Sequence, residues 1–411
     1  MTGNGGAAQG EGTWWQRPSG LGVLVSGGAP TLHLAAGALC AFHENQVSFD
    51  VIGASGAGAL PGLLYAVPKS RDRAGALRCT VHLNVDDLVY ARVPSNYKVF
   101  QKRGPLTEYF WRMGKRLTPF QIPSDLSYYD SLERWCNDCV DLLFAAATPT
   151  TLNYFSKSVC QRMPGFLDDV VDWAALPDYP KEFFVNAFDL ETQDLILFDK
   201  TNLNSESFFA ALAMPWLYEP ATVNGRRYTE GASHDPSGLE ALWQRGNLDL
   251  DAIIAIETVT PDLWNDPSNI YDALQITIMD PLVTLAQRML ALYGRIEFAR
   301  NAGRQPGPPL PKLYVLKFPL PQWEIPRMLE WSYSNALTLW SIGHDAADEF
   351  CRLLFSTTDN DQEFLERNFR YYRQYRNVPR VAEFLELFDE LLAEDEPAAP
   401  TKPASRRRRR S

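Results

Sequence analysis

Hydrophobic and polar positions fall into two alternating patterns along most of the chain. Short apolar runs bounded by Gly, Pro or charged residues are typical of buried strands, and the stretches between them have the spacing of amphipathic helices. The predicted strands are residues 21–25, 49–52, 183–188, 195–198, 252–257 and 313–318. The predicted helices are residues 32–45, 59–67, 205–213, 326–354 and 381–394. Strands that alternate with helices in this way predict an α/β domain with a mainly parallel central sheet.

The same pattern predicts how the chain is organised. We expect a three-layer α/β domain over residues 20–320, with a helical insertion at about 70–175, where the strand pattern is lost. Residues 321–394 are expected to form a helical C-terminal segment. Residues 1–19 are polar and Gly-rich, and residues 395–411 form a Pro/Ala-rich tail that ends in Arg406–Arg410; both are predicted to be disordered.

Net charge, the absence of long apolar segments and the cysteine spacing limit which partners and locations we expect for this protein. The net charge of −11 argues against nucleic acid as a partner, because phosphate binding needs a basic surface. No secretory signal and no membrane span are visible, so we expect a cytoplasmic protein, with peripheral contact to a membrane as an alternative. Cys136 and Cys139 form a CxxC, but no second Cys or His pair lies nearby, so we expect ordinary helix residues. No metal or organic cofactor is expected.

The strongest local feature is the sequence Gly53-Ala54-Ser55-Gly56-Ala57-Gly58, which lies between a predicted strand and a predicted helix. A sharp strand-to-helix turn holds a serine hydroxyl exposed beside the helix N-terminus, where an oxyanion is stabilised. If Gly53 opens the G-x-S-x-G pattern, Ser55 is the nucleophile and Ala57 replaces the last glycine. If Gly58 closes the pattern, Gly56 takes the nucleophile position and the protein is inactive. We favour Ser55; a close-packing turn or an anion-binding loop is the further alternative.

A second glycine turn follows the first predicted strand, at Ser26-Gly27-Gly28-Ala29. Backbone N–H groups in such a loop can point at a shared anion. We expect the amides of Gly27 and Gly28 to form the oxyanion hole.

These two turns and a third segment at residues 214–236 resemble patatin-like phospholipases in order and spacing, over roughly residues 20–240. The third segment contains Thr229-Glu230-Gly231-Ala232, which is similar to the D-G-[GA] motif that carries the catalytic carboxylate of that family. The resemblance implies a Ser–carboxylate dyad of Ser55 and Glu230, although the family has Asp where this chain has Glu. Asp235 is the nearest substitute, and His234 is the histidine nearest to this position. The glycine loop also lacks the arginine that usually follows it in the family.

The expected function is therefore hydrolysis of acyl esters of lipids through an acyl-enzyme on Ser55, with Glu230 as the base. Two alternatives stay open: a non-catalytic patatin-fold protein that binds lipid or the surface of a lipid body, and an acyltransferase. Apolar side chains in two regions are expected to include some that line the acyl pocket. They are Tyr109, Phe110, Trp111, Met113, Phe120, Tyr128 and Tyr129, and then Trp323, Met328, Leu329, Trp331, Tyr333, Leu337 and Trp340.

Overall fold

The computed structural model describes residues 20–94, 96–99, 101–102, 109, 128–147, 159–160, 166–215, 218–246, 249–258, 270–318 and 330–370. Its centre is an eight-stranded sheet in the order β10-β9-β1-β2-β5-β8-β7, with β6 paired to β5. The strands β10, β9, β1, β2 and β5 are parallel to one another, and β6, β7 and β8 pair antiparallel. The bounds are β1 Leu21–Val25, β2 Val51–Ala54, β5 Glu182–Asp189, β6 Asp194–Asp199, β7 Ala221–Val223, β8 Arg226–Glu230, β9 Ala252–Ile256 and β10 Lys312–Leu316.

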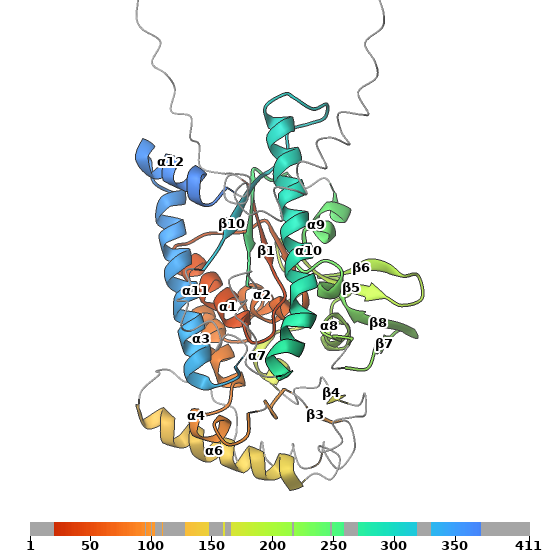
Figure 1. The fold of residues 1–411 in the computed structure, drawn as a ribbon, viewed down its shortest axis with the longest axis vertical. Coiled ribbons are helices and arrows are strands. Elements are labelled where there is room, and N and C mark those ends of the chain that lie inside the picture. The colour runs from red at the N-terminus through yellow and green to blue at the C-terminus, as the bar shows by residue number, and fades with distance from the viewer. Residues whose placement is uncertain are drawn as a thin grey trace, which may run out of the picture.

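Helices cover both faces of this sheet (Figure 1). On one face lie α1 (Leu32–Glu44), α2 (Ala59–Ala66), α3 (Arg73–Arg78) and α11 (Tyr333–Leu354), and on the other lie α9 (Leu239–Arg245) and α10 (Ile270–Asn301). Residues of β1 alternate between the two cores: Val23 and Val25 face the first, and Leu24 faces the second. A sheet buried on both faces requires strands that are apolar at every position, as β1 is. The predicted three-layer α/β fold is confirmed.

The remaining elements are short or lie away from the sheet. They are η1 Gly56–Gly58, η2 Cys79–Leu83, α4 Asp87–Tyr90, β3 Gln101–Lys102, α6 Tyr128–Ala147, β4 Val159–Cys160, α7 Phe166–Val170, α8 Ser205–Ala211, η3 Gly231–Ser233 and α12 Asp359–Asn368. Helix α6 lies at one end of the molecule (Figure 1). An ion pair from Arg134 to Asp86 joins it to the start of α4, and a second from the buried Asp138 joins it to Lys98. This helix belongs to the region predicted as a helical insertion.

Three elements differ from their predictions. Strand β2 occupies residues 51–54 and not 49–52, because small residues at Gly53 and Ala54 pair with β1 and β5. Helix α10 was not predicted, because its exposed Pro281 interrupts the pattern. Helix α11 begins at Tyr333, where we expected a start at 326; residues 319–329 lie outside the described part.

Several predictions concern segments outside the described residues. They are the N-terminal segment 1–19, the helix at 381–394, the tail at 395–411 and its Arg406–Arg410 run. Among the helices that the structure describes, none is long and apolar enough to cross a membrane.

Candidate active site

The turn that follows β2 is sharp and is centred on Gly56. Ser55 has an extended backbone with φ −131° and ψ 135°, whereas Gly56 has φ +48°, and η1 and α2 follow directly. Gly58 packs so closely on the end of β1 that a Cβ atom there would lie 2.5 Å from the carbonyl oxygens of Val25 and Ser26. Gly58 is therefore the close-packing glycine of this turn, two residues after the residue with the positive φ.

The side chain of Ser55 is fully buried and does not line the pocket described below. Its hydroxyl donates a hydrogen bond of 2.7 Å to the backbone carbonyl of Asp235, and its amide donates to the carbonyl of Val25 at 3.0 Å. The hydroxyl thus fixes the loop that contains Asp235 to the end of β2. In this arrangement it is not offered to a carboxylate base.

Gly56 is the residue that faces the carboxyl group of Glu230. A Cβ atom built at Gly56 would overlap Glu230 Oε1 and would lie 3.2 Å from Glu230 Cδ and 3.0 Å from Ala232 Cβ. A side chain at position 56 would therefore point directly at the acid. The structure places Gly56, and not Ser55, where a hydroxyl group could pass its proton to this carboxylate.

Glu230 ends β8 and is half-buried. Its amide donates to the carbonyl of Ala213 at 2.9 Å, but its carboxyl group has no hydrogen-bond partner among the described residues. Burial raises the pKa of Glu230 to about 8. At neutral pH a large share of this group is therefore protonated, so it can donate a hydrogen bond.

Asp235 and His234, the other candidates near Glu230, have structural contacts of their own. The buried carboxylate of Asp235 accepts hydrogen bonds from the amides of Ala241 at 2.9 Å and Leu239 at 3.1 Å, at the start of α9. His234 stacks on Phe188, with 3.6 Å between ring centroids and 2° between the planes. Neither side chain lines the pocket.

The glycine loop after β1 lies beside this turn. The Gly27 amide donates to the carbonyl of Pro236 at 3.1 Å, and the Gly27 carbonyl accepts from the Thr258 hydroxyl at 2.6 Å. The predicted oxyanion donor Gly27 is thus already used within the protein. Gly28 has φ +138°, and within the described residues no hydrogen bond from its amide is found. Of the two predicted donors, the Gly28 amide is the one left for a ligand.

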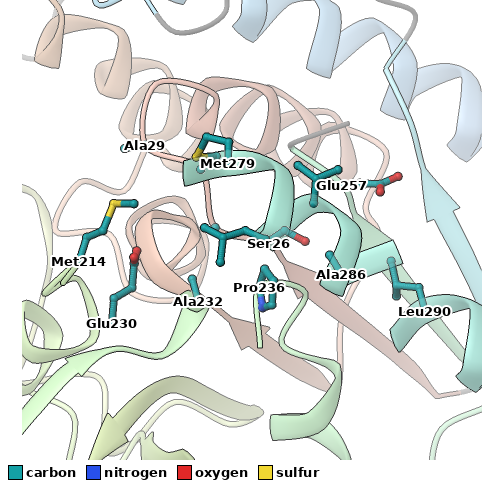
Figure 2. Close-up of a pocket in the computed structure, with 14 residues that line it drawn as sticks. Ser26, Ala29, Met214, Glu230, Ala232, Pro236, Glu257, Met279, Ala286 and Leu290 are labelled. Atoms are coloured by element: carbon teal, nitrogen blue, oxygen red, sulfur yellow. The ribbon is translucent and has the colours of Figure 1, made fainter. Parts of the chain in front are cut away.

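An apolar pocket joins the glycine loop and Glu230 (Figure 2). Its cavity volume is about 70 Å³. The lining residues are Ser26, Gly27, Gly28, Ala29, Met214, Glu230, Ala232, Pro236, Glu257, Met279, Leu282, Val283, Ala286 and Leu290. Among these residues Ser26 carries the one hydroxyl group. Figure 2 shows Met214 and Glu230 projecting side by side from the strand side of the pocket, with Met279 opposite.

Helix α10 supplies the apolar wall that sequence reasoning missed. Its pocket-lining residues follow one face, at positions 279, 282, 283, 286 and 290. That spacing is visible in the sequence, but it was not assigned to a helix. Of the residues predicted for the acyl pocket, those with described side chains do not line it. Tyr109 is exposed, Trp331 is half-buried, and Tyr333, Leu337 and Trp340 pack in the core around α11. The side chains of Phe110, Trp111, Met113, Phe120, Tyr128, Tyr129, Trp323, Met328 and Leu329 lie outside the described part.

One group of potential metal ligands lies away from the pocket, where α1 and α11 cross. Cys40, Glu44 and His344 place their ligand atoms within 4.8 Å of one another. His344 Nε2 lies 2.8 Å from Glu44 Oε2, and the Cys40 thiol lies 3.5 Å from Glu44 Oε1. Hydrogen bonds within the cluster account for these contacts. Cys136 and Cys139 lie on α6, in the helix predicted for them.

Comparisons with known proteins agree with the family resemblance. The family model described as patatin-like phospholipase matches residues 23–243, just over half of the chain, and this range includes both the Gly56 turn and Glu230. Among solved structures, the crystal structure of VipD from Legionella pneumophila is similar with a TM-score of 0.34 and 13% sequence identity, over 94% of this chain and 82% of that one. No curated protein sequence matches the chain. The family assignment thus rests on the sequence model: the chain belongs to the patatin-like phospholipases, a family of lipid acyl hydrolases.

Proposed function

We propose that this protein binds an acyl lipid in the pocket beside Glu230 and does not form an acyl-enzyme. The observation that carries the proposal is Gly56, which occupies the one position of the turn that faces the carboxyl group. Glycine has no side chain that could attack a carbonyl carbon. The protonated carboxyl group and the Gly28 amide are instead two hydrogen-bond donors for the carbonyl oxygen of a bound acyl group.

The pocket supports a lipid as the ligand. Its wall from α10 consists of Met279, Leu282, Val283, Ala286 and Leu290, so an alkyl chain would lie against aliphatic and thioether groups. A concave apolar site with a few convergent polar groups is the usual form of a small-molecule site. The lipid would come from a membrane or a lipid body through peripheral contact, and a cytoplasmic location remains the expectation for this chain.

Hydrolysis through Ser55 is the second candidate, since the family is one of hydrolases and a serine adjoins the nucleophile position. Ser55 would have to leave the carbonyl of Asp235 and turn toward Glu230, with Gly28 and the helix N-terminus at the oxyanion. An acyltransferase would use the same acyl-enzyme. Both activities require a reactive Ser55, so Ser55→Ala would abolish them.

Binding can be tested with a fluorescent C12 monoacylglycerol titrated into the delipidated protein. Ala286→Phe fills the pocket from α10, and we expect it to weaken binding about tenfold or more. Ala302→Phe, at an exposed position just after the same helix, is the matched control and should bind as the natural protein does. Equal affinities of all three proteins would contradict lipid binding at this site, and release of fatty acid that depends on Ser55 would favour the second candidate.

A further inference from the structure

Positions 56 and 230 compete for the same space. A Cβ atom at position 56 overlaps Glu230 Oε1, and the wall behind it is tight because Ala232 Cβ would lie 3.0 Å away. Ala232 has little room to move away, because its other side packs closely on the backbone of Gly27. A Cβ atom built on Gly27 would lie 2.9 Å from the Cβ atom of Ala232. The movable part of this arrangement is the side chain of Glu230.

We propose that Glu230 fills the volume of the missing nucleophile, so that a hydroxyl at position 56 and a glutamate at position 230 exclude each other. This inference rests on the proposed function, because it takes Gly56 as the nucleophile position. Shortening the acid by one methylene would retract its carboxyl group by about 1.5 Å, roughly one C–C bond. A serine at position 56 together with an aspartate at position 230 would then face each other without overlap.

The surroundings needed by such a serine are present. The turn leads directly into η1 and α2, so the first amides of a helix lie next to position 56, and Gly28 lines the same pocket as Glu230. With a fluorophosphonate probe, the introduced hydroxyl oxygen would attack phosphorus, the P–F bond would break, fluoride would leave, and the hydroxyl proton would pass to the carboxylate at position 230. Nothing else is consumed in this step.

The test is a set of four variants labelled with a fluorophosphonate and followed by intact-protein mass: Gly56→Ser, Glu230→Asp, Gly56→Ser/Glu230→Asp and Gly56→Ala/Glu230→Asp. We expect the first double variant to gain one adduct, at least about tenfold faster than Gly56→Ser alone. The alanine double variant has the same packing without the hydroxyl group, so it should stay unlabelled. It also controls for any reaction at the neighbouring Ser55.

Thermal unfolding gives a second readout that does not need activity. Gly56→Ser should lower Tm by roughly 3 °C or more, from the positive φ and the overlap with Glu230 together. Adding Glu230→Asp should recover part of this loss. Three outcomes would overturn the proposal that a hydroxyl at position 56 and Glu230 exclude each other. They are additive Tm shifts, equal labelling of Gly56→Ser and Gly56→Ser/Glu230→Asp, and a folded Gly56→Ser/Glu230→Asp variant that stays unlabelled. Labelling of the natural protein at Ser55 would instead overturn the proposed function.

Discussion

At the scale of single residues, the backbone of the turn after β2 sets which residue faces the carboxyl group of Glu230. The motif allowed two registers, with Ser55 or Gly56 in the nucleophile position. Residue types alone did not separate them, because the difference lies in the backbone: Gly56 has φ +48°, and Gly58 packs against the end of β1. The hydrogen bond from Ser55 to the carbonyl of Asp235 joins residues 180 positions apart, so no local pattern revealed it. Glu230 was predicted from its motif, and the structure adds a half-buried carboxyl group that has no hydrogen-bond partner among the described residues.

The raised pKa of Glu230 has a consequence for stability. Burial holds the pKa of Glu230 at about 8 in the folded protein, whereas in the unfolded chain the group has its ordinary pKa of 4.5. The native state therefore binds more protons between these values, and stability falls as pH rises through this range, by about 1.4 kcal/mol per pH unit for one group. Glu230→Gln removes this contribution, so its Tm should decline less between pH 5 and 8 than that of the natural protein. Thermal scans at several pH values check this, with the exposed-site variant Glu363→Gln as control.

At the scale of secondary-structure elements, the core strands, the helices that directly follow them and the covering helix α11 were predictable, and the covering helix α10 was not. The runs at 21–25 and 183–188 are continuous and apolar because both faces of those strands are buried. Helix α10 escaped prediction because its pocket face is aliphatic, its other faces are mixed and Pro281 lies within it. The close crossing of α1 and α11 was also invisible, since it joins residues about 300 positions apart.

Gly37 lies at that crossing and Gly62 of α2 does not, so we expect the two positions to differ in the effect of an added methyl group on stability. A Cβ atom on Gly37 of α1 would overlap the carbonyl oxygen of Trp340 and lie 2.8 Å from the His344 amide nitrogen. On Gly62 of α2 the nearest atom, Phe183 Cε2, would be 3.4 Å away. We expect Gly37→Ala to destabilise the protein by about 2–3 kcal/mol, and Gly62→Ala to stabilise it by about 0.5–1 kcal/mol through helix propensity. Urea unfolding of both variants measures the contrast, and similar effects of the two would contradict the close crossing.

At the scale of the whole molecule, the layer order and the family followed from the sequence. Alternating strands and helices predicted a parallel sheet covered on both faces, and the order of three loops matched one family. The pocket did not follow, because it forms only where the ends of β1, β8 and β9 meet α10. Fold and family therefore identify the place where a lipid would bind. Whether that place also carries chemistry depends on which side chain follows β2 at the point of positive φ.

The reactivity of the natural protein toward a fluorophosphonate tests this account most directly. Intact-protein mass after incubation with excess probe reports an activated serine without knowledge of the substrate. We predict no adduct on the natural protein, because Gly56 faces Glu230 and Ser55 is buried against Asp235. A single adduct that disappears in Ser55→Ala would contradict the account and establish Ser55 as the nucleophile of a working hydrolase.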